Sequence, residues 1–93
     1  MVSTESFEIF VMKKYNEVAR EGKYYGVYEK YAVWLDNSYR QPIAIKWSLV
    51  RNLQQYEMIV RTFVPKSDET YQKMVANFNA LKTLYNYLMT GEE

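Results

Sequence analysis

The sequence predicts an α+β fold with the element order α-β-β-β-α: a three-stranded antiparallel meander with an N-terminal helix and a long C-terminal helix. Three observations lead to this prediction. Apolar residues recur at helical spacing near both ends of the chain, apolar and polar residues alternate in its middle, and short links separate the alternating runs. A chain of 93 residues is expected to form one α+β domain, residues 1–93.

The first element, residues 4–21, has the pattern of an amphipathic helix. Ser3 or Thr4 can accept hydrogen bonds from the amide groups of its first turn, and Gly22 can end the helix in a conformation with positive φ. The apolar stripe that would face the core consists of Phe7, Phe10, Val11, Tyr15 and Val18.

Three extended segments follow, at residues 27–35, 43–49 and 56–64. Side chains of similar character recur at every second position, which is typical of strands. The links at 36–42 and 51–55 are short, so consecutive strands are expected to pair in antiparallel fashion. The clearest alternation is that of Ile43, Ile45, Trp47 and Leu49 with Ala44, Lys46 and Ser48.

The last element is a helix that begins after Pro65, which ends the third strand. Ser67 can cap it, and Asp68 and Glu69 lie where the helix dipole favours negative charge. Gly91 is expected to stop the helix. Its apolar residues follow a heptad-like stripe: Tyr71, Met74, Phe78, Leu81, Tyr85 and Leu88.

The two faces of the predicted sheet differ in character. The aliphatic face must be buried against the helices, because burial of each large side chain is worth roughly 1.5–3 kcal/mol. Trp47 is expected to be buried and Trp34 to be exposed. The aliphatic face contains Val27, Val33, Leu35, Ile43, Ile45, Leu49, Met58, Val60 and Val64, and the opposite face contains Tyr28, Lys30, Trp34, Lys46, Ile59, Arg61 and Phe63.

A basic surface with interleaved aromatic rings favours binding of single-stranded nucleic acid. The rings of Tyr28, Trp34 and Phe63 would stack on bases, and the cations Lys30, Lys46 and Arg61 would contact phosphates. Two alternatives compete with this hypothesis. The face could be covered by a helix or a second subunit, or it could bind a protein partner, as a small inhibitor or regulator of a host protein would.

The last helix is longer than the predicted sheet requires, which favours a homodimer. The residues expected at the dimer interface are Leu84, Tyr85, Tyr87 and Met89. The alternative is that this stripe packs only on the sheet of its own domain.

The composition argues against catalysis, metal binding and cofactors. The chain has no Cys and no His, so it lacks the usual general base and the commonest metal ligands, and no phosphate loop or nucleophile motif is present. We therefore expect no enzyme and no catalytic residue. No run is long and apolar enough for a membrane span, so we expect a cytoplasmic protein. The composition suits a protein of a virus or mobile element, for which the cytoplasm would be that of a host cell.

Overall fold

The computed structural model is all-α and describes residues 1–37 and 41–93. No strand occurs in these ranges, so the predicted α+β fold is wrong. The two expected terminal helices are present, whereas the three expected strands are parts of two further helices. The elements are α1 (Thr4–Arg20), α2 (Gly26–Asp36), α3 (Pro42–Thr62) and α4 (Glu69–Thr90).

Helix α1 begins and ends as its sequence predicts. The Ser3 hydroxyl accepts a hydrogen bond from the Ser6 amide at 3.1 Å and so caps the first turn. Gly22 follows the helix with a φ of 71°, a left-handed conformation that favours glycine.

Helix α4 has the predicted ends but a different cap. Asp68, and not Ser67, accepts a hydrogen bond from the Thr70 amide, at 2.7 Å. A carboxylate is well suited to this position because it also complements the helix dipole. Gly91 ends the helix with a φ of 75°.

Helix α3 replaces the predicted second and third strands. Ile45 and Leu49 are buried, whereas Ile43 and Trp47 are exposed. Four apolar residues at every second position therefore form two stripes on opposite sides of one helix, because residues four apart share a helix face. The predicted turn at 51–55 lies inside this helix.

Helix α2 replaces the predicted first strand. Val27, Tyr31 and Leu35 recur at intervals of four and are buried, while Val33 is exposed. The link predicted at 36–42 lies partly outside the described residues; of the described part, Asp36 ends α2, and Gln41 and Pro42 begin α3.

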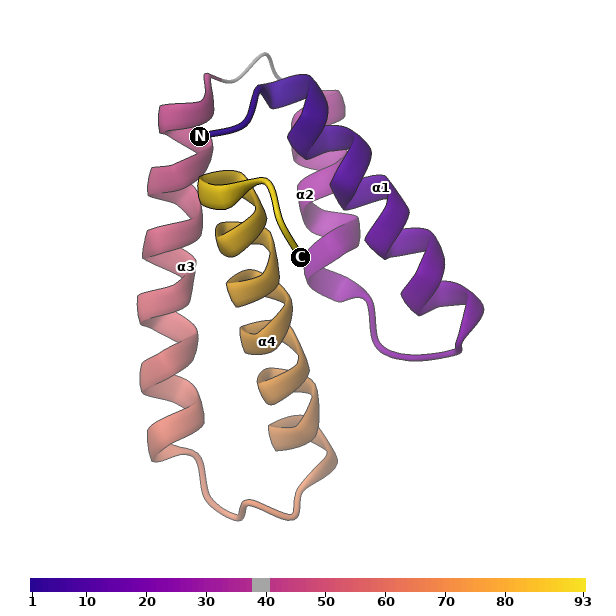
Figure 1. The fold of residues 1–93 in the computed structure, drawn as a ribbon. Helices are drawn as coiled ribbons and strands as arrows, with labels where there is room; N and C mark the ends of the chain where they lie inside the picture. Colours follow the sequence, from indigo (N-terminus) through magenta and orange to yellow (C-terminus); the bar gives the residue numbers. More distant parts are fainter. Residues whose placement is uncertain (38–40) are drawn as a thin grey trace.

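The helices form two pairs, α1 with α2 and α3 with α4, and the first pair packs on the second mainly through α4 (Figure 1). The rings of Phe10 and Tyr87 stack with centroids 3.9 Å apart where α1 meets α4. The buried apolar core consists of Phe7, Phe10, Val11, Val27, Tyr28, Tyr31, Leu35, Ile45, Leu49, Ala80, Leu81, Leu84 and Leu88.

Polar contacts hold both chain ends to the helices. The Val2 amide donates to the Leu88 carbonyl at 2.8 Å. At the other end, the Glu93 carboxylate accepts from Lys13 at 3.2 Å and from Lys14 at 3.1 Å. The Glu93 side chain therefore ties the C-terminal end of the chain to α1.

The prediction of which residues are buried and which are exposed is wrong at several positions. Five residues expected in the core are exposed: Val33, Ile43, Trp47, Met58 and Val64. The two tryptophans are reversed, because Trp47 is 58% exposed whereas Trp34 packs partly buried against the core. No helix in the described part of the chain combines the length and apolar character that crossing a bilayer requires.

Candidate functional site

The residues predicted to bind nucleic acid do not share a surface. Tyr28 is buried in the core, Phe63 stacks on Tyr71, and Arg61 pairs with Glu57 at 2.8 Å. Since the sheet face does not exist, the hypothesis of a basic and aromatic sheet that binds nucleic acid is wrong, and so is the alternative of a protein partner on that face. The six residues lie on α2 (Tyr28, Lys30 and Trp34), on α3 (Lys46 and Arg61) and just after α3 (Phe63).

The residues predicted for a dimer interface lie mostly inside one protomer. Leu84 is fully buried, and Tyr85 and Tyr87 pack against the core. Met89 is 36% exposed. Dimerisation through this set is not tested by the structure of one chain and stays a prediction.

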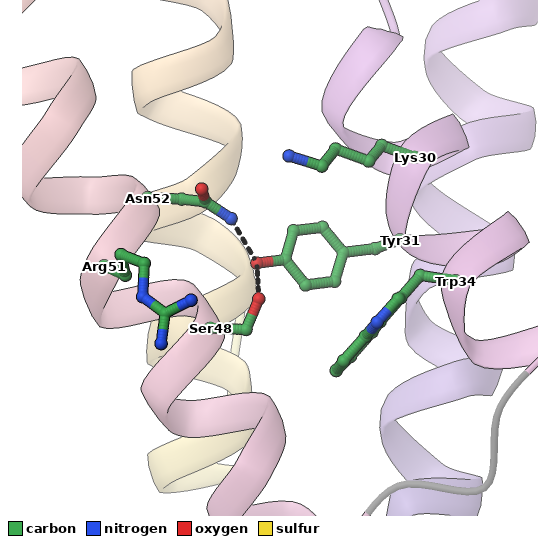
Figure 2. A pocket seen from close by; sticks show the side chains of 6 residues that line it. All are labelled: Lys30, Tyr31, Trp34, Ser48, Arg51 and Asn52. Carbon is green, nitrogen blue, oxygen red and sulfur yellow. Dashed lines mark hydrogen bonds between the residues drawn. The ribbon is translucent and has the colours of Figure 1, made fainter.

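A polar pocket of about 210 Å³ lies between α2 and α3. Two of the predicted residues, Lys30 and Trp34, line it, and sequence reasoning missed the other four. On α3 the lining positions are 48, 51 and 52, whose spacing of three and four places them on one side of a helix. The six side chains, three from each helix, are Lys30, Tyr31, Trp34, Ser48, Arg51 and Asn52 (Figure 2).

A hydrogen-bond network forms the floor of this pocket. The Tyr31 hydroxyl lies 2.9 Å from the Ser48 hydroxyl and accepts from the Asn52 amide at 2.9 Å, as the dashed lines in Figure 2 show. The Tyr31 side chain is only 2% exposed. These two bonds therefore satisfy a buried polar group and fix α2 relative to α3.

The Tyr31 hydroxyl stays protonated at neutral pH. Burial raises the pKa of this phenol above its ordinary value of 10.0, and the opposing hydrogen bonds with Ser48 and Asn52 do not offset the effect. The floor of the pocket thus presents neutral hydroxyl and amide groups.

Two cations stand at the rim of the pocket, one on each helix. Lys30 extends from α2 toward α3, and Arg51 projects from α3 (Figure 2). Among the described residues, neither cation has an ion pair, and no carboxylate lines the pocket. The charge of the site is therefore positive and uncompensated.

Trp34 supplies an apolar wall beside the polar floor. Its indole meets the Tyr31 ring edge-on, with centroids 5.6 Å apart and planes at 80°. Such a pair holds both rings in fixed orientation. The pocket therefore combines one apolar wall, a neutral hydrogen-bonding floor and a cationic rim.

No family model, curated protein or solved structure matches this chain. The site must therefore be interpreted from its own chemistry. Within residues 1–37 and 41–93, no group of three acidic side chains is placed to hold a metal ion.

Proposed function

We propose that this domain binds a small anionic ligand in the pocket between α2 and α3 and does not catalyse a reaction on it. The observation that carries the proposal is the pair of cations, Lys30 and Arg51, that flank hydrogen-bonding groups with no carboxylate in the lining. Guanidinium and ammonium groups form strong charge-assisted hydrogen bonds with phosphate, sulfate and carboxylate.

The size of the pocket limits the ligand. A volume of about 210 Å³ corresponds to roughly seven water molecules, at ~30 Å³ each, and is below the ~300 Å³ at which pockets for drug-sized molecules begin. A phosphate or carboxylate with a small attached group fits this space. Trp34 favours an apolar attached group, because it forms the one large apolar wall.

The lack of a proton acceptor supports binding without catalysis. General base catalysis requires a group whose pKa lies near the working pH. The lining contains no carboxylate, and the pKa of Tyr31 is shifted upward, away from neutrality.

Calorimetry and amide chemical shifts can measure the binding of two probes, phenyl phosphate and inorganic phosphate. We expect both probes to shift residues of α2 and α3, with tighter binding of phenyl phosphate. Lys30→Gln and Arg51→Gln should each weaken binding roughly tenfold, which corresponds to about 1.4 kcal/mol, and higher salt should also weaken it.

A matched control is Arg20→Gln, which removes an exposed cation at the end of α1, a helix that contributes no side chain to the pocket. This variant should bind the probes like the unaltered protein. The proposal is wrong if neither probe binds, or if Arg20→Gln weakens binding as much as Arg51→Gln does.

A further inference from the structure

Helix α3 carries an exposed apolar ridge on the side away from the core. Ile43 and Trp47 are 48% and 58% exposed, and Val50 lies one turn further along the same side. Helical geometry places Lys46 on one flank of this ridge and Arg51 on the other, since each lies about 70° from its centre line at ~100° per residue. The Lys46 ammonium lies 5.6 Å from the centre of the Trp47 ring.

A groove between α1 and α2 has apolar lining and charge of the opposite sign. This groove has a volume of about 260 Å³, with Met12, Ala32 and Val33 as its apolar lining and two carboxylates, Glu8 on α1 and Asp36 on α2. The Val33 side chain is 55% exposed. An apolar groove with acidic residues on both walls therefore matches an apolar ridge with a cation on each flank.

The charged residues on both surfaces lack ion pairs within the chain. In the described residues, none of Glu8, Asp36, Lys46 and Arg51 takes part in a salt bridge. Each surface thus has exposed apolar area and unneutralised charge, and the two differ in sign. Charge complementarity of this kind favours encounter and fixes the relative orientation of two proteins.

We propose that the α3 ridge of one copy docks in the α1–α2 groove of a second copy of this chain. The ridge lies on α3 and the groove lies between α1 and α2, so the two are different surfaces of one molecule and the contact is heterologous. Such contacts repeat from copy to copy and form rings or open chains. A contact made by one helix lies at the small end of specific interfaces, so assembly should be weak and concentration-dependent.

The test uses two variants that each block one half of the contact. Val33→Lys places a cation in the groove, and Trp47→Lys removes the indole from the ridge. Each variant alone should remain monomeric in sedimentation velocity at concentrations where the unaltered protein assembles. A mixture of the two should form dimers and nothing larger, because the first retains an intact ridge and the second retains an intact groove.

Met58→Lys is the matched control, because Met58 is exposed on α3 but lies 11 residues from Trp47, about 16 Å along the helix. It should leave assembly unchanged, while added salt should weaken assembly. Circular dichroism and thermal unfolding will establish that each variant is folded. A monomeric unaltered protein, assembly by either blocked variant alone, or a mixture without dimers would each overturn the proposal.

The proposed anion site and the proposed assembly share only Arg51, which lies between the pocket and the ridge. The assembly test changes residues that do not line the anion pocket, and the anion test can rely on Lys30, which lies on neither docking surface. Failure of one proposal is therefore distinguishable from failure of the other.

Discussion

Tyr31 connects the core of the molecule to its candidate site. Its ring is buried with the apolar side chains of α2, and its hydroxyl group reaches Ser48 and Asn52 on α3. A buried hydroxyl is tolerated only because both partners are present. The same residue thus positions the walls of the pocket and supplies its neutral floor.

The raised pKa of Tyr31 predicts a loss of stability in alkaline solution. The native state retains this proton where the unfolded chain has lost it, so the stabilisation is complete below pH 10.0 and disappears as the pH rises through the native pKa. Tyr31→Phe should make this decline shallower and, near neutral pH, should lower the free energy of unfolding by about 1–3 kcal/mol, because the Asn52 amide loses its acceptor. Urea unfolding across this pH range checks both effects.

Tyr24→Phe is the control for this experiment, because Tyr24 is 48% exposed. It should leave the neutral-pH stability nearly unchanged. Tyr28 also has a pKa raised by burial, so some alkaline decline should persist in the Tyr31 variant. An unchanged pH profile in Tyr31→Phe would contradict the role assigned to this phenol.

At the scale of the elements, α1 and α4 could be predicted from the sequence, whereas α2 and α3 could not. The terminal helices have one apolar stripe each and clear end signals, including Gly22 and Gly91. In α3 the residues Ile43, Ile45 and Trp47 fit a two-residue period as well as a four-residue one. Only the packing of α3 against α4 decides between the two, and this contact is not visible in local sequence.

The candidate site could be predicted only in part, because its residues lie on α2 and α3, the two helices that the sequence does not predict. The types of Lys30 and Trp34 mark them as binding residues, although the predicted sheet places them on a surface that does not exist. The sequence predicts a turn at Arg51 and Asn52, and in a turn their spacing from Ser48 does not indicate a shared face. Only the helix α3 brings the three side chains together.

The helical register of α3 makes a prediction that a strand would not share. Ile45→Ala should lower the free energy of unfolding by about 2–5 kcal/mol, because it leaves a cavity in the core. Ile43→Ala should change it by no more than about 0.5 kcal/mol, since Ile43 is exposed. Chemical denaturation of the two variants measures the difference. In a strand, both side chains would lie on the same face, so equal and large losses would contradict the helix.

At the scale of the whole molecule, charge is distributed unevenly around α2. The groove on its α1 side carries Glu8 and Asp36, and the pocket on its α3 side carries Lys30 and Arg51. A formal net charge of +1 therefore conceals two local regions of opposite sign. Local fields of this kind, more than the total charge, decide which charged partners approach which side.

The C-terminal contact with α1 should be lost in acid. Hydrogen bonds with Lys14 and Lys13 hold the pKa of Glu93 below its ordinary value of 4.5. The stabilisation that the ionised Glu93 carboxylate gives to this contact is therefore present above pH 4.5 and is lost as the pH falls through the native pKa of Glu93. The chemical shifts of the Glu93 carboxyl group and the neighbouring amides should report this transition in an acid titration.

Glu93→Gln should release the C-terminal residues from α1 at neutral pH and abolish the acid transition, with only a small effect on global stability, because the pair is on the surface. Glu92→Gln provides the matched control, since Glu92 contacts the helix through its backbone carbonyl, which accepts from Asn86. Equal behaviour of the two variants would show that the Glu93 side chain does not hold the C-terminal residues.

Helix α2 borders the anion pocket and the α1–α2 groove, since Tyr31 and Trp34 line the first and Ala32 and Val33 line the second. One helix of 11 residues thus forms a wall of each, and its position relative to α1 and α3 sets the width of both. Occupants of the two sites that favour different positions of this helix must weaken each other's binding by the same factor, as thermodynamic linkage requires.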